Sequence, residues 1–153
     1  MGNSTAALEV EIREMSSQPY LGMRVRAPLG AVGPEVQAGF ASLYAKLAHL
    51  AVAPAGPPFL VADAPRDGFL DMELGAPCAT SVQAGDGFEA ATLPGGKVAV
   101  TVHRGAYDAI GKVYAELARW ITAEGLVTAG PPREVYLSGP GQEPVTELIW
   151  PVR

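Results

Sequence analysis

Ala55-Gly56-Pro57-Pro58 recurs in the chain as Ala129-Gly130-Pro131-Pro132, 74 residues further along. The same offset places Glu73-Leu74 on Glu147-Leu148 without a gap. One tetrapeptide could recur by chance in a chain with 14 prolines and 18 glycines, but two separate motifs that share one register indicate an internal repeat. The sequence therefore predicts two copies of one structural unit.

Both copies contain a helical pattern that this offset also superimposes. Apolar residues recur at spacings of three and four, as expected for a helix with one buried face. In the first copy they are Phe40, Leu43 and Leu47, and in the second Tyr114, Leu117 and Ile121. We predict one helix in each copy, with these side chains in the core.

Strand-like runs flank each predicted helix. Runs 8–15 and 19–27 are predicted to form one hairpin, and runs 87–93 and 97–103 another. The strands expected after the helices are 58–63 and 69–75 in the first copy, and 134–138 and 145–151 in the second.

The predicted fold class is therefore α+β, with two tandem β-α-β-β type repeats related by a pseudo-twofold axis in a single domain. The repeats cover residues 8–83 and 86–153, and the domain covers 8–153. Residues 1–7 are expected to be a disordered leader. A seam between repeated units is a favoured ligand site, so we expect a ligand cleft between the repeats.

Composition limits the possible functions. The net charge of −5 is spread without a cluster of Lys or Arg, which argues against direct binding of nucleic acid. A single cysteine, Cys78, excludes an intrachain disulfide and is expected to be a small apolar core residue. The two histidines, His49 and His103, lack the spacing of zinc ligands. We predict a cytoplasmic chain that is not bound to a membrane and has neither metal nor cofactor.

Two carboxylates share one register in the closing strands, Glu73 and Glu147. Glu147 is the more informative, because the run around it is apolar and an unpaired carboxylate is costly to bury there. It could face a cleft and bind a ligand. Alternatively it could be exposed, or paired with Arg133 or Arg104.

The aromatic residues divide in the same way. Tyr107 follows a strand at a corner, and alternation along the strand sends Tyr136 to the same face as Glu134, so either phenol could line a cleft. Residues on the helical stripes, such as Tyr114, are expected to be packing residues. No Ser nucleophile motif and no Gly-rich phosphate loop occur in the sequence.

Four segments in this order and spacing resemble the GyrI-like small-molecule-binding (effector-binding) superfamily. They are His103-Arg104-Gly105-Ala106-Tyr107, Ala129-Gly130-Pro131-Pro132, Glu134-Val135-Tyr136-Leu137 and Thr146-Glu147-Leu148-Ile149-Trp150-Pro151-Val152. The likeness covers residues 8–153. The family pattern usually has Pro at the position of Ala106, a departure that affects the turn more than the ligand.

The resemblance implies a two-repeat fold with a central cleft, in which an acidic residue matching Glu147 meets cationic ligands among aromatic side chains. It also implies a stand-alone member without a helix-turn-helix domain. Stand-alone relatives include gyrase-inhibitory proteins and hydrolases of cyclopropane-bearing, DNA-alkylating natural products, in which the cleft carboxylate and a tyrosine are implicated in catalysis.

Three hypotheses follow. The first, which we favour, is a binding protein for amphipathic, aromatic or cationic small molecules. Its ligand contacts would be Glu147, Tyr136, Tyr107, Trp150 and Glu73. The second is a metal-independent hydrolase of reactive small molecules, with Glu147 as base and Tyr136 or Tyr107 as proton donor. The third is a gyrase-inhibitory protein. The expected partner is a small molecule, and the expected oligomeric state is a monomer or homodimer.

Overall fold

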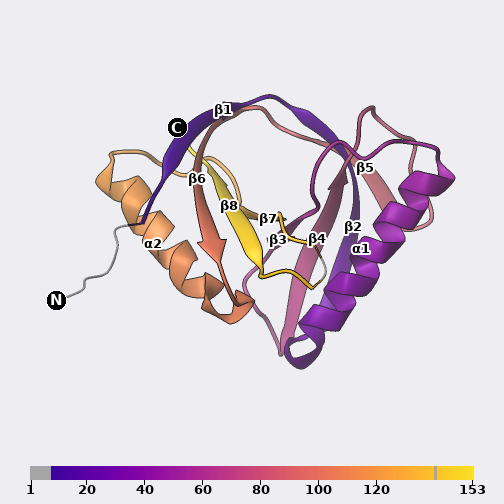
Figure 1. The fold of residues 1–153 in the computed structure, drawn as a ribbon, viewed down its shortest axis with the longest axis horizontal. Coiled ribbons are helices and arrows are strands. Elements are labelled where there is room, and N and C mark those ends of the chain that lie inside the picture. Colours follow the sequence, from indigo (N-terminus) through magenta and orange to yellow (C-terminus); the bar gives the residue numbers. More distant parts are fainter. Residues whose placement is uncertain (1–7, 140) are drawn as a thin grey trace. The chain divides into compact units, whose positions relative to one another are not determined.

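The computed structural model describes residues 8–139 and 141–153 (Figure 1). The leader predicted at residues 1–7 lies outside the described residues. The chain divides into two compact units. Unit 2 is the continuous segment 16–95, and unit 1 combines the described residues up to Met15 with 96–153.

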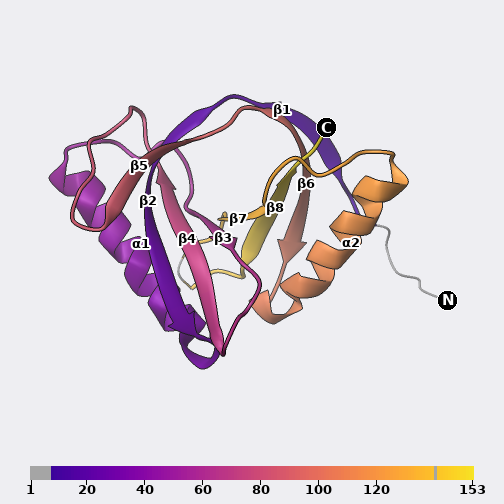
Figure 2. The same ribbon diagram turned by 180° about the vertical axis from the view of Figure 1, so that it is seen from behind.

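Unit 2 is a four-stranded antiparallel sheet with one helix. Its strands lie in the order β3-β4-β2-β5. They are β2 (Gln18–Pro28), β3 (Phe59–Ala62), β4 (Phe69–Pro77) and β5 (Phe88–Leu93). The 3-10 turn η1 (Leu29–Ala31) leads from β2 into the helix α1 (Val32–His49). Both ribbon views show α1 lying along β2 and β4 (Figures 1 and 2).

Unit 1 has the same composition of elements. Its antiparallel strands lie in the order β1-β6-β8-β7. They are β1 (Glu11–Met15), β6 (Gly96–Arg104), β7 (Arg133–Tyr136) and β8 (Val145–Pro151). The turn η2 (Tyr107–Ala109) precedes the helix α2 (Ile110–Ala123). The observed fold is thus the predicted mixed α+β class, with antiparallel strands and two helices.

The two predicted hairpins are wrong. Strand β1 pairs with β6, where Glu11 lies opposite Val100, and β5 pairs with β2, where Glu89 lies opposite Gly22. Tight hairpin turns need a positive φ at the first loop residue. The proline at 94 cannot adopt one, and Ser16-Ser17 lacks the Gly, Asn or Asp that favours one. The chain therefore does not fold back at either turn. The two strands of each predicted hairpin belong to different units, β1 and β6 to unit 1 and β2 and β5 to unit 2. The compact units consequently do not coincide with the predicted repeats, whose boundaries stay a prediction.

The internal register of the two units is nevertheless the same. In unit 2, β3 and β4 place Phe59 opposite Gly75, and in unit 1, β7 and β8 place Arg133 opposite Ile149, 74 residues further along. The strands before the helices correspond at an offset of 78 instead, as Tyr20 and Val98 lie opposite equivalent prolines. Helix α1 has 18 residues and α2 has 14, so about one helical turn absorbs the difference and preserves the buried face. The duplication itself remains an inference from the sequence.

The core of each unit lies between its helix and its sheet. In unit 1, Leu117 and Ile121 of α2 pack on Ala99, Leu148 and Val152. In unit 2, the helix residues Leu43 and Leu47 are buried, as are Met72, Leu74 and Ala76 on β4. Gly39 lets α1 approach β4 closely, because a Cβ there would collide with Leu74. The predicted core position is confirmed for these four helix residues, whereas Phe40 and Tyr114 are only partly buried.

Candidate functional site

Alternation along β8 divides the predicted site residues between two faces of the unit 1 sheet. Leu148, Trp150 and Val152 face α2, so Glu147 points to the opposite face. Tyr136 lies opposite Thr146 in the β7–β8 ladder and therefore shares the α2 side. The structure brings Tyr136, Tyr107 and Trp150 to one side of the sheet and Glu147 to the other.

A hydrogen-bonded cluster lies on the α2 side. The carboxylate of Glu134 accepts one hydrogen bond from the Tyr114 hydroxyl and one from the Tyr136 hydroxyl, each 2.8 Å long. The ring of Tyr107 packs edge-on against Tyr136, with 5.7 Å between ring centroids. We call Glu134, Tyr107, Tyr114 and Tyr136 the tyrosine–glutamate cluster. Trp150 adjoins it, because its ring packs against Tyr114 at 6.3 Å.

The carboxylate of Glu134 in this cluster forms no ion pair with a described residue. Within residues 8–139 and 141–153 no Lys, Arg or His lies within ion-pair distance of Glu134. Burial raises the pKa of Tyr114 and of Tyr136, and the negative charge of Glu134 raises both further. Both phenols therefore stay protonated at neutral pH and remain donors. The cluster also has an open side, because Tyr107 is 47% exposed.

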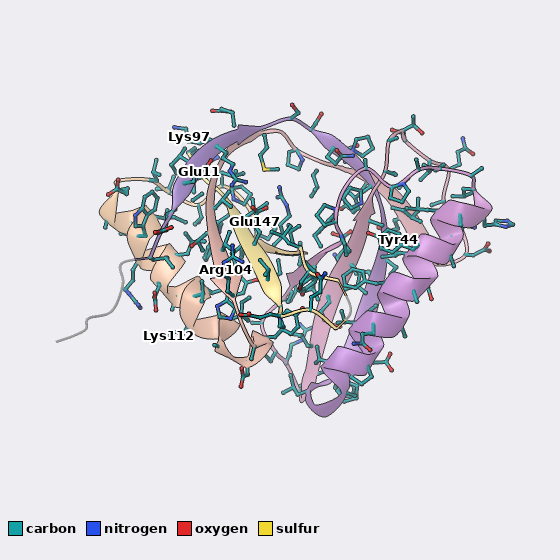
Figure 3. The ribbon with its side chains drawn as sticks, viewed as in Figure 1. Glu11, Tyr44, Lys97, Arg104, Lys112 and Glu147 are labelled. Carbon is teal, nitrogen blue, oxygen red and sulfur yellow. The ribbon has the colours of Figure 1, made fainter. Side chains whose placement is uncertain are left out.

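Glu147 has a different environment on the opposite face. Its Oε2 atom lies 3.2 Å from Nη1 of Arg13, and its side chain is 16% exposed. Arg13 also donates to Glu11, over 2.9 Å from Nε. Glu147 lies on β8, in the interior of the sheet, and Glu11 on β1 (Figure 3). The sequence-based alternatives paired Glu147 with Arg133 or Arg104, but the cation that pairs with it is Arg13.

Glu73 occupies in unit 2 the ladder position that Glu147 occupies in unit 1. It lies opposite Val61, and Glu147 lies opposite Val135. The Tyr20 hydroxyl donates a hydrogen bond that is shared by both carboxylate oxygens of Glu73, at 3.2 and 3.1 Å. Burial and the Glu73 charge raise the pKa of Tyr20 to about 12. Unit 2 therefore contains a second phenol–carboxylate pair.

The ring of Phe59 completes the Glu73 environment. It packs edge-on against Tyr20, with ring centroids 5.0 Å apart. Glycines make room for both rings: a Cβ at Gly75 would collide with Phe59, and one at Gly22 would meet the Tyr20 ring at 3.0 Å. Both aromatic side chains are buried. They form a fixed wall next to the carboxylate.

Sequence reasoning missed the central residue of the tyrosine–glutamate cluster. Alternation already placed Glu134 on the face of Tyr136, which was a usable signal. Tyr114 was assigned to packing because it lies on a helical stripe, and its hydroxyl reaches a strand 20 residues away. Nothing local in the sequence predicts that contact.

The structure offers no metal centre in the part of the chain that it describes, where no three His, Cys, Asp or Glu side chains are grouped to hold an ion. In the same residues, no helix has both the length and the apolar character needed to cross a membrane. Cys78 is buried, which raises the pKa of its thiol, and the predicted core position is confirmed.

The architecture is a mixed α+β fold in which two helices pack on antiparallel strands. The family model for the GyrI-like small molecule binding domain matches residues 8–153. The chain therefore belongs to the family of GyrI-like small molecule binding domains, and the family supports a role in binding ligands. No match was found among curated protein sequences.

Several solved structures share the fold. The crystal structure of the EcmrR C-terminal domain has a TM-score of 0.74 and 16% identity, and the alignment covers 97% of this chain and 99% of that one. In a complex of EcmrR with DNA the TM-score is 0.77 at 17% identity, with 96% of this chain covered. There the chain spans only 58% of the EcmrR chain.

Two further neighbours bear on ligands and activity. A structure described as a hydrolase from Listeria innocua has a TM-score of 0.71 at 17% identity, with 97% of this chain and 94% of that one covered. SAV2435 bound to tetraphenylphosphonium has a TM-score of 0.57 at 21% identity, with 95% and 94% covered. At these identities the likeness shows the fold alone.

Proposed function

We propose that this protein binds cationic small molecules with aromatic or apolar groups, and that the tyrosine–glutamate cluster holds the cation. The observation that carries the proposal is the state of Glu134: a partly buried carboxylate that two phenols hold in place and that no cation of the described chain neutralises. Buried charges are normally paired, so a ligand is the natural counter-ion.

The rings around Glu134 suit the same ligand class. An aromatic face attracts a cation by about 0.5–2 kcal/mol, and aromatic cages are a common way to recognise quaternary ammonium groups. Tyr107 is partly exposed and Trp150 adjoins Tyr114, so aromatic surface surrounds the carboxylate. Because burial keeps Tyr114 and Tyr136 protonated, the two phenols contribute rings and donors but no competing charge.

A buried hydroxyl on the same face adds support. Thr146 lies opposite Tyr136 in the ladder and is fully buried, and its Oγ1 has no hydrogen-bond partner among the described residues. Such groups need a partner such as a water or a ligand atom. The neighbour SAV2435, bound to the bulky cation tetraphenylphosphonium, supports the choice of ligand class as an analogy of fold.

The carboxylates selected from the sequence have secondary roles in this proposal. Glu147 is already compensated by Arg13, which weakens the case for it as the main charge partner. Glu73 repeats the phenol–carboxylate arrangement with Tyr20 and could hold a second cationic group in unit 2.

A matched set of variants tests the proposal. We expect Glu134→Gln to weaken tetraphenylphosphonium binding by about 10- to 100-fold while changing the affinity for neutral triphenylphosphine oxide little, because a charge-assisted contact contributes about 1.5–3 kcal/mol. Glu124→Gln, an exposed carboxylate at the end of α2, is the control. Isothermal titration calorimetry that gives equal losses for the two ligands would remove Glu134 from the site.

Hydrolysis of a reactive small molecule is the second candidate. It is favoured by the Tyr136–Glu134 hydrogen bond, since a phenol beside a carboxylate can act as an acid–base pair. The raised pKa of Tyr136 opposes it, because proton donation becomes harder. Mass spectrometry of strained-ring electrophiles incubated with the protein distinguishes the two. Consumption that Tyr136→Phe abolishes would establish the enzyme, and unaltered compounds would leave only binding.

A further inference from the structure

Arg133, the first residue of β7, has a buried guanidinium group whose hydrogen-bond donors are mostly unpaired among the described residues. It is 6% exposed, and among the described residues its guanidinium forms one hydrogen bond, from Nη2 to the sulfur of Met15 over 3.6 Å. Of the residues described, none offers it a carboxylate within ion-pair distance. Arginine is rarely buried unless it is paired, and a thioether is a weak acceptor.

The carboxylate nearest to Arg133 is that of Glu147, which already forms an ion pair with another arginine. Glu147 shares a sheet face with Arg133, one diagonal step along the β7–β8 ladder, and attracts it electrostatically. Its carboxylate, however, contacts Arg13. Burial consequently dominates and lowers the pKa of Arg133. Among the described residues Arg133 therefore has no carboxylate of its own within ion-pair distance.

The fold does not require a charge at this position. The residue of unit 2 at the same ladder position is Phe59, which is 1% exposed and packs over Gly75. One unit thus fills the position with an aromatic ring and the other with a guanidinium. Replacing buried charges by apolar side chains of similar size is often neutral or stabilising, so a purely structural role does not explain Arg133.

We propose that Arg133 binds the carboxylate of an organic anion with an apolar body, which displaces the Met15 sulfur from the guanidinium. A planar carboxylate matches the guanidinium fork and can accept two parallel hydrogen bonds. Met15 is partly buried and unbranched, so it can move aside. Arg13 offsets the repulsion that Glu147 would otherwise exert on the anion.

The surroundings select for the apolar body. Val100, Val135 and Ile149 share this face of the sheet with Arg133 and are buried. Because alternation places the side chains of adjacent strand residues on opposite faces, this site is distinct from the tyrosine–glutamate cluster around Glu134. The proposal therefore goes beyond the cation site, and each can fail without the other.

Calorimetry with 4-phenylbutanoate and its neutral amide tests the site. We expect the wild-type protein to bind the carboxylate at least tenfold more tightly than the amide. Arg133→Met should remove this preference and keep or raise the melting temperature. Arg104→Gln should retain it, since Arg104 is an exposed arginine of β6 that shares the sheet face of Arg133. Glu134→Gln should also retain it, which separates this site from the cation site.

Two further measurements decide the result. Met15→Ala should tighten carboxylate binding severalfold, because it uncovers the guanidinium, and it tests the site in a protein with Arg133 intact. Inorganic phosphate should compete only weakly, because it has no apolar body. Equal binding of carboxylate and amide by the wild type, unchanged preference in Arg133→Met, or unfolding of Arg133→Met would each overturn the proposal.

Discussion

The guanidinium of Arg13 on β1 lies 3.2 Å from the carboxylate of Glu147 on β8, although 134 residues separate them in the sequence. Strand β6 lies between their two strands in the sheet, so the contact spans a third strand. It depends on β1 joining β6 and not the adjacent β2. The strand pairing thus determines the environment of Glu147.

Removing the cation should therefore destabilise the fold. We expect Arg13→Met to lower the free energy of unfolding by about 1–2 kcal/mol, because it leaves Glu147 partly buried and unpaired, while the partial exposure of Arg13 limits the loss. Urea denaturation measures it. Adding Glu147→Gln should recover part of the loss, and Arg104→Met is the exposed control. A double variant no more stable than Arg13→Met would argue against the pair.

Removing a hydrogen bond to Glu134 should lower the free energy of unfolding by a measurable amount. Tyr114→Phe removes one donor from a partly buried carboxylate, so we expect a loss of about 1–2 kcal/mol in the free energy of unfolding. Tyr44→Phe is a control on α1, where no hydrogen bond of the hydroxyl is seen among the described residues. Equal effects of the two substitutions in urea denaturation would show that the carboxylate bond adds nothing.

Alkaline pH should weaken the fold through Tyr20. Its pKa is raised to about 12 in the folded chain, against about 10 in an unfolded one, so the unfolded state loses the phenol proton first. The contribution is fully present below pH 10 and is lost as the pH rises towards 12, by up to about 3 kcal/mol. Tyr20→Phe should flatten this part of the pH profile of unfolding. An unchanged slope would exclude Tyr20 as its cause.

Gly75 should tolerate no side chain. We expect Gly75→Ala to cost about 1–3 kcal/mol, because its Cβ would collide with the buried Phe59 ring. Gly56→Ala is the matched control, since its Cβ would make only an ordinary contact with Pro77 at 3.9 Å. Thermal denaturation compares the two. Phe59→Leu added to Gly75→Ala should restore part of the stability if the clash is the cause.

The sequence predicted what depends on local periodicity. The apolar stripes through Leu43 and Leu117 correctly predicted two helices with those residues in the core, and the strands after each helix were also correctly predicted. The 74-residue offset correctly predicted that Glu73 and Glu147 hold the same ladder position. These features depend on neighbours three to four residues away or on a repeat visible in the letters.

Strand pairing and charge pairing could not be predicted in this way. Adjacent runs such as β1 and β2 looked like hairpins, and only turn chemistry at Ser16-Ser17 and Pro94-Gly95 argued against it. Arg13 reaches Glu147 because β1 pairs with β6 and not with β2. The wrong prediction of a turn between β1 and β2 therefore also gave the wrong partner for Glu147. Tyr114 was similarly invisible as a donor, because helical periodicity says which face is buried but not what a hydroxyl reaches.

The pairing of β1 with β6 makes unit 2 an insertion within unit 1. Met15, the residue before unit 2, lies directly opposite Gly96, the residue after it. The two ends of the inserted segment also meet, because Gln18 lies opposite Leu93. A short turn from Met15 to Gly96 could therefore replace residues 16–95 and leave β1 and β6 as an ordinary hairpin. During synthesis unit 2 is complete before the rest of unit 1 exists, so β1 must wait for its partner until the inserted segment has been made.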